Sequence, residues 1–146
     1  MSRAALLLVV PMVFACTARE EAPMDTAATA AAPAANYARN WTVTSMPEGR
    51  DTVLVTYDMV ATNDQTGWRT TLPGREPQTP RVVAMSADTV VLELDPFESV
   101  LRPGQMVTTR TTFRMQGDQL VGTTIARYPT GGADSVTILR TRATRR

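Results

Sequence analysis

The sequence predicts an all-β fold, in which about eight antiparallel strands form a meander that closes into a small barrel. Beyond residue 40, apolar and polar residues alternate with a period of two, as they do on half-buried strands. Short segments rich in turn-forming residues separate these stretches, which favours hairpins in series. No window in the same region has the periodicity of an amphipathic helix. A meander that closes on itself leaves no free sheet edge.

The first element along the chain is a predicted signal peptide, residues 1–15. Arg3 is followed by an uncharged and mostly apolar run over residues 4–15. This run is shorter than the roughly 20 residues of a membrane-spanning helix but has the length expected of a signal peptide. It ends at Val13-Phe14-Ala15-Cys16, which resembles the lipobox of bacterial lipoproteins. Phe14 stands where that motif usually has a small residue.

The lipobox resemblance implies that the chain is cut before Cys16 and that this cysteine carries acyl chains such as palmitate. The protein would then be anchored in the cell envelope through its lipid. Thr17 follows the cysteine, which by resemblance to lipoprotein sorting implies the periplasmic side of the outer membrane if the source has two membranes. A plain secretory signal with a chance cysteine is the alternative.

Residues 16–36 are predicted to be a flexible tether, because they are rich in Ala and Pro and contain no aromatic side chain. The β domain follows at residues 37–146. Within it we expect strands near residues 40–46, 51–60, 67–72, 80–86, 88–95, 105–115, 118–128 and 134–142. The alternation is clearest in the sixth of these, where Val107, Thr109, Thr111 and Phe113 share one face that we expect to point inward.

Local features explain the breaks between strands. Asp51, Asp88 and Asp134 each open a strand beside Ser or Thr, which predicts local hydrogen bonds to the turn backbone. Residues 95–104 form the longest expected loop inside the domain and carry Phe97, Val100 and Leu101. These apolar side chains either cover one end of the barrel or belong to a lid or recognition surface.

Three features of the domain resemble bacterial lipocalin-like domains. They are Trp41 on the first strand, the segment 117–123 (GDQLVGT), and Arg140 or Arg142 on the last strand. The resemblance implies a barrel in which an arginine of the last strand lies across the tryptophan, and we expect Arg140 to make this contact. Ala38 or Arg39 stands where lipocalins have a glycine. The alternative is that these arginines belong to a solvated basic tail.

The composition excludes most catalytic and metal sites. The chain has no His and a single Cys, and all of its 15 basic residues are Arg, balanced by 14 acidic residues. No serine could therefore be activated by His or Lys, no thiolate cage can hold a metal ion, and no basic excess indicates nucleic-acid binding. We expect no enzyme activity, no cofactor, no metal site and no nucleic-acid partner. Glu93, Asp95 and Glu98 are expected to form a solvated acidic patch.

The sequence thus predicts a monomeric, membrane-anchored and non-catalytic binding protein. Its barrel would bind a small apolar ligand, or the domain would bind an envelope partner. The alternative is a structural or inhibitory interaction module with a filled core. A void of roughly 300 Å³ or more would favour the ligand. The candidate ligand-binding residues are aromatic: Trp41, Tyr57, Trp68, Phe97, Phe113 and Tyr128.

Overall fold

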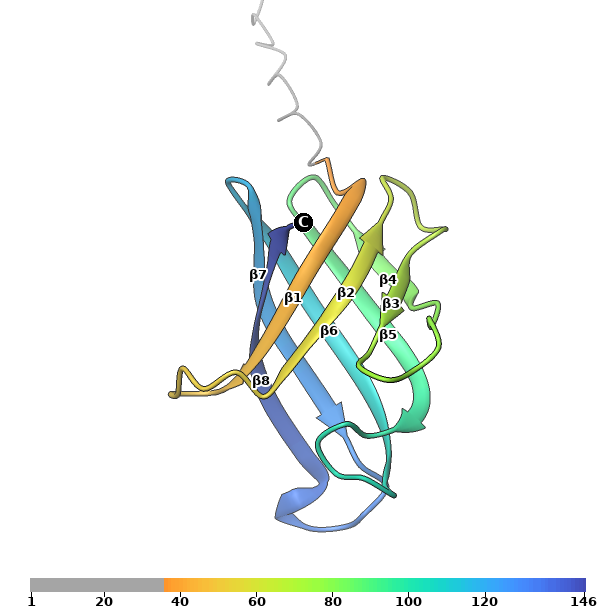
Figure 1. Cartoon of the computed structure of the whole chain (residues 1–146), viewed down its shortest axis with the longest axis vertical. Helices are drawn as coiled ribbons and strands as arrows, with labels where there is room; N and C mark the ends of the chain where they lie inside the picture. The colour runs from red at the N-terminus through yellow and green to blue at the C-terminus, as the bar shows by residue number, and fades with distance from the viewer. Residues whose placement is uncertain (1–35) are drawn as a thin grey trace, which may run out of the picture. The chain divides into compact units, whose positions relative to one another are not determined.

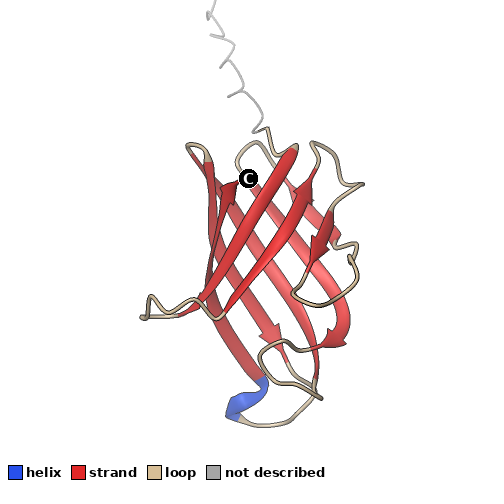
Figure 2. Cartoon of the chain, in the orientation of Figure 1, coloured by secondary structure: helices blue, strands red, loops and turns tan. Residues whose placement is uncertain are grey.

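The computed structural model describes residues 36–146, so the predicted signal peptide, Cys16 and nearly all of the tether lie outside the described residues. The described part of the chain is all-β, as predicted (Figures 1 and 2). A single 3-10 turn, η1 (Ala133–Ser135), precedes the last strand. No helix among these residues is long and apolar enough to cross a bilayer. The eight strands are β1 (Arg39–Pro47), β2 (Val55–Ala61), β3 (Arg69–Thr71), β4 (Arg81–Met85), β5 (Thr89–Glu98), β6 (Met106–Gln116), β7 (Gln119–Arg127) and β8 (Val136–Arg145).

All eight strands belong to one strongly curled antiparallel sheet with the order β3-β2-β1-β8-β7-β6-β5-β4. Every predicted strand overlaps an observed one, and the predicted pairing of the first and last strands is confirmed. The β1–β8 ladder runs from Trp41 opposite Arg145 to Pro47 opposite Leu139. All other neighbours in the sheet are consecutive in sequence, as expected of a meander.

The prediction that the strands close into a barrel is wrong in one respect, because β3 and β4 are not joined by a ladder. Along this seam the described residues form only an isolated bridge, between Thr70 and Gln78. β3 is three residues long. The connection to β4 contains Pro73, Pro77 and Pro80, which have no N–H to donate to a neighbouring strand. The result is a half-barrel with two free edges facing one another.

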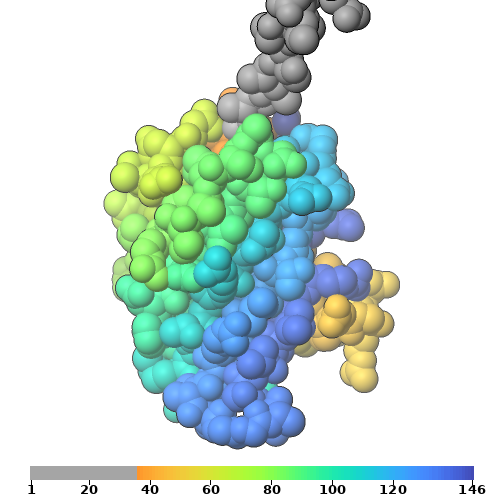
Figure 3. Space-filling view, turned by 180° about the vertical axis from the view of Figure 1, so that it is seen from behind, coloured from red at the N-terminus to blue at the C-terminus, as the bar shows by residue number. Residues whose placement is uncertain are grey.

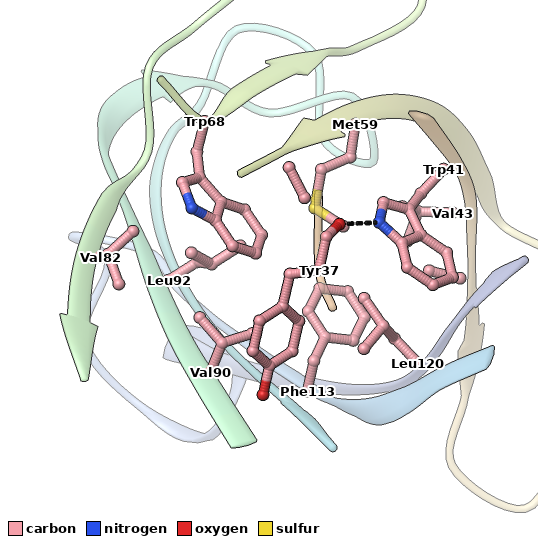
Figure 4. Close-up of a cluster of buried hydrophobic side chains, with 12 residues drawn as sticks. Tyr37, Trp41, Val43, Met59, Trp68, Val82, Val90, Leu92, Phe113 and Leu120 are labelled. Atoms are coloured by element: carbon pink, nitrogen blue, oxygen red, sulfur yellow. Dashed lines mark hydrogen bonds between the residues drawn. The ribbon is translucent and has the colours of Figure 1, made fainter. Parts of the chain in front are cut away.

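One end of the half-barrel is filled by a packed apolar cluster (Figure 4). Trp41 and Trp68 are 0 % and 1 % exposed, and both indole N–H groups have partners. The Nε1 of Trp41 donates to the carbonyl of Tyr37 at 3.1 Å, and the Nε1 of Trp68 donates to the carbonyl of Asp64 at 2.8 Å. The packed cluster consists of Tyr37, Trp41, Val43, Met59, Ala61, Trp68, Val82, Val90, Leu92, Phe113, Leu120 and Ala143.

Two aspartates hold the loops next to the packed cluster. The Asp64 carboxylate accepts hydrogen bonds from the amide and the hydroxyl of Thr66, at 2.7 and 2.8 Å. These bonds keep the pKa of Asp64 below its ordinary value. Asp88 is bonded by the hydroxyls of Thr89 and Ser86, which also lower the pKa of its carboxyl. The predicted local bond to the turn backbone is made by Ser86, whose hydroxyl accepts from the amide of Thr89 at 3.1 Å, whereas the Asp88 carboxylate bonds to the two hydroxyl groups.

The expected contact between Arg140 and Trp41 is not formed. Its side chain points to the outer face, where Nη2 donates to a carboxylate oxygen of Asp51 at 2.8 Å. The guanidinium near the tryptophan belongs to Arg39, whose Cζ lies 5.4 Å from the ring centroid of Trp41. Arg140 shares its strand face with Ile138, and that face is the outer one, since Ile138 is 45 % exposed. The prediction was wrong because Val136 and Ile138, which are apolar but exposed, share this face with Arg140.

Candidate functional site

A cavity lies inside the half-barrel, beside the packed cluster. Its volume is about 70 Å³, and Met59, Leu92 and Phe113 belong both to its wall and to the packed cluster. Its other walls come from the inner faces of β1, β2, β3 and β5 to β8, and from the loops at the opposite end of the sheet. Leu72 and Pro80, which flank the unjoined edges of β3 and β4, line the cavity from the seam.

Four of the six aromatic residues predicted to bind a ligand line this cavity: Tyr57, Phe97, Phe113 and Tyr128. Trp41 and Trp68 do not line it, because both are fully enclosed in the packed cluster. An aromatic residue type predicts an inward side chain, but it does not show which end of the barrel is filled and which is hollow.

The loop between β5 and β6 can be followed at one end of the sheet in Figure 1. Its residues line the far end of the cavity. It is shorter than predicted, because β5 continues past Pro96 to Glu98 with a register shift between Leu94 and Phe97. Val100 and Leu101 from this loop line the cavity, which agrees with their predicted role in covering one end.

Hydrogen bonds tie this loop to its neighbours. The Ser99 hydroxyl lies 3.1 Å from that of Tyr128 and also accepts hydrogen bonds from the amides of Leu101 and Arg102. The Arg102 guanidinium stacks on Tyr128, with Cζ 4.1 Å from the ring centroid, and donates to the carbonyl of Asp134 at 2.8 Å. The loop is therefore fixed to Tyr128, which directly follows β7, and to η1.

A row of buried hydroxyl groups crosses the inner face of the sheet from β1 to β6. The hydroxyl oxygens of Ser45 and Thr141 are 3.3 Å apart, those of Thr141 and Thr124 are 2.9 Å apart, and those of Thr124 and Thr111 are 2.8 Å apart. We call these four residues the hydroxyl row. All four are buried, and Ser45, Thr111 and Thr124 line the cavity.

Sequence analysis placed Thr109 and Thr111 on the inner face, and both line the cavity. It missed Ser45, Thr124 and Thr141. Each of these lies at an inward position of an alternating strand, so the period-two pattern could have identified them one by one. Only the register of four strands shows that they form a row.

The wall of the cavity carries no charged side chain. Burial raises the pKa of the Tyr57 hydroxyl above its ordinary value, so this group is neutral at physiological pH. Glu93 lies on the outer face, as predicted, where it is paired with Arg81 and with Arg110, whose Nη1 is 2.6 Å from a carboxylate oxygen. Within residues 36–146 no group of three or more His, Cys, Asp or Glu could hold a metal ion.

Two larger depressions lie outside the barrel and are weaker candidates. One, of about 440 Å³, borders the turn after β3 and includes Arg75 and Glu76. The other, of about 330 Å³, contains the Glu93 ion pairs. Seen from behind, the outer surface of β5 to β8 is otherwise continuous, with the 47–54 hairpin projecting beside it (Figure 3). The interior cavity is the candidate site because its wall is mostly apolar and carries no charged side chain, whereas charged residues line both depressions.

Comparison of the chain with protein-family models, curated proteins and solved structures finds no match. The functional interpretation therefore depends on the geometry and chemistry of the cavity.

Proposed function

We propose that this protein is a non-catalytic binding protein whose half-barrel holds one end of a small, slim apolar ligand. The observation that carries the proposal is the mostly apolar and uncharged cavity beside the packed cluster. Phe97, Val107 and Leu139 give it an apolar wall, which favours transfer of apolar atoms from water. The lipocalin-like sequence features agree with this function.

The size of the cavity limits the ligand. At about 70 Å³ it falls below the ~300–1,000 Å³ of pockets for drug-sized molecules. A few heavy atoms would occupy it, and the rest of the ligand would lie outside. The seam is where widening would break the fewest backbone hydrogen bonds, because β3 and β4 share no ladder and only the two bonds between Thr70 and Gln78 join this part of the chain.

A second candidate function is an interaction module that binds another envelope protein. Two observations favour it: the cavity is small, and apolar side chains are exposed at the projecting hairpin. Val53 and Leu54 are 49 % and 45 % exposed there. Covering these two side chains with a partner would remove apolar surface from water, which is favourable.

Hexane binding separates the two functions. The ligand proposal predicts saturable binding of hexane to the purified protein, measured by ligand-observed NMR. Ala126→Leu adds three carbons to a cavity-lining position and is expected to weaken binding at least tenfold, because it occupies the same space. Thr112→Leu, on the exposed face of β6, is the matched control and leaves binding unchanged. No saturable binding to the wild type would favour the interaction module.

We further propose that the protein is held at the envelope membrane by lipid on Cys16, as the lipobox motif implies. Cys16→Ser is expected to prevent maturation, so that unprocessed precursor replaces the shorter membrane-bound form. Cell fractionation and mass spectrometry of the N-terminus measure this, with Thr17→Ser as the control. Normal processing and membrane retention of Cys16→Ser would contradict the anchor.

A further inference from the structure

We propose that the cavity selects an uncharged ligand end that bears a hydrogen-bond acceptor, such as a ketone, ester or ether oxygen, over a carboxylate. This inference rests on the proposed ligand site and specifies the chemistry that the site recognises. Three observations support it: an unmatched proton in the hydroxyl row, further hydroxyls without partners, and the absence of charge in the wall.

The hydroxyl row has one more proton than it can use internally. Its four hydroxyls are joined by three hydrogen bonds, and each bond uses one proton. One of the four O–H groups therefore lacks an acceptor within the row. Among the described residues these hydroxyls form no hydrogen bond beyond these three, and Ser45, Thr111 and Thr124 line the cavity. A buried donor without an acceptor is costly, so an acceptor atom in the cavity would stabilise this wall.

Three more hydroxyls line the same cavity: those of Tyr57, Thr70 and Thr109. None of them has a hydrogen-bond partner within residues 36–146. Thr70 is 4 % exposed, and it comes from β3, outside the strands of the hydroxyl row. An oxygen atom entering the cavity thus meets donors from separate strands, whereas a hydrocarbon end would leave all of them unpaired.

The absence of charge in the cavity wall favours a neutral oxygen acceptor over a carboxylate. A carboxylate would be the strongest acceptor, but it would be buried without a cation, because no arginine lines the cavity. Arg102, which stacks on Tyr128 behind the wall, already donates to Asp134 and Thr137. A neutral carbonyl or ether oxygen accepts the same hydrogen bonds with a far smaller loss of hydration.

The test uses two pairs of threonines on the same two strands. Thr111 and Thr124 are directly opposite one another on the inner face, and Thr112 and Thr123 are directly opposite one another on the outer face. Thr→Val keeps the shape and removes the hydroxyl, so the inner double variant removes two of the three hydroxyls that the row presents to the cavity. The outer double variant is the matched control. Dissociation constants for hexane and for 2-hexanone are measured on all three proteins, and thermal unfolding shows that they are folded.

The ratio of the 2-hexanone constant to the hexane constant is expected to rise about three- to tenfold in the inner double variant. It should stay at the wild-type value in the outer double variant. Comparing this ratio between the variants and the wild type cancels the difference in hydration between the two probes, because that difference is the same for every protein. At neutral pH hexanoate is expected to bind more weakly than 2-hexanone, because only its hydrocarbon end would enter the cavity, and its binding should tighten as the pH falls through its carboxyl pKa.

An unchanged ratio in the inner double variant would overturn this inference while leaving the proposed function intact, since both probes would still bind. Binding of hexanoate at neutral pH as tight as that of 2-hexanone would overturn it as well. If neither hexane nor 2-hexanone saturates the wild type, the proposed function fails and this inference fails with it.

Discussion

Replacement of Trp41 with alanine is expected to lower the free energy of unfolding by about 3–5 kcal/mol. Trp41 is completely buried in the packed cluster, and its indole N–H bonds to the Tyr37 carbonyl at 3.1 Å. The substitution removes a large apolar side chain, leaves a cavity and deprives that carbonyl of its donor. A domain with a total stability of about 5–15 kcal/mol would then be close to unfolding at room temperature.

Urea unfolding followed by circular dichroism measures this effect. Trp41→Phe should lose less stability, since it keeps an aromatic ring and gives up the hydrogen bond. Val60→Ala, at an exposed position on β2, is the control and should change stability by about 0.5 kcal/mol or less. A loss below about 1 kcal/mol for Trp41→Ala would show that the packed cluster does not stabilise the fold as described.

The second large effect is expected at Gly122, where any side chain would collide with the neighbouring strand. A Cβ at this position would lie 1.8 Å from the backbone oxygen of Thr112 and 3.0 Å from the Cα of Phe113. Both are backbone atoms of β6, so they can move only if β6 and β7 separate. Gly122→Ala should therefore cost about 3 kcal/mol or more, at the upper end of overpacking effects.

Gly131→Ala is the matched control for Gly122→Ala. A Cβ at Gly131 meets no atom within 4 Å, and no change above about 0.5 kcal/mol is expected. Thermal unfolding of the two variants compares them directly. A Gly122→Ala protein with the wild-type melting temperature would mean that the β6–β7 approach is wider than the structure shows.

Most of the fold could be predicted from the alternation of apolar and polar residues along the chain. It predicted all eight strands and the inward positions of Thr109, Thr111 and Phe113, because period two depends only on which residues face the core. It could not assign the outer face of β8, where exposed Val136 and Ile138 resemble core residues. The error about Arg140 follows directly from that face.

The other features that the sequence did not predict depend on contacts between distant parts of the chain. The seam between β3 and β4 depends on how far the sheet curls, which local patterning does not specify. The hydroxyl row requires the register of β1, β8, β7 and β6, and the division into a filled and a hollow end requires the packing of the aromatic residues. The candidate site was therefore predictable as an interior with aromatic and threonine side chains, but the hydroxyl row in its wall was not.

The central claim is that a neutral ligand occupies the interior of the half-barrel. Methyl NMR during a titration with 2-hexanone tests it most directly. We expect saturable shifts of the methyl resonances of Leu94, Val107 and Leu139 in the cavity wall. The methyl resonances of Val60 and Val83 on the outer face should not shift. Shifts confined to the outer-face methyl groups, or no saturable shift at all, would contradict it.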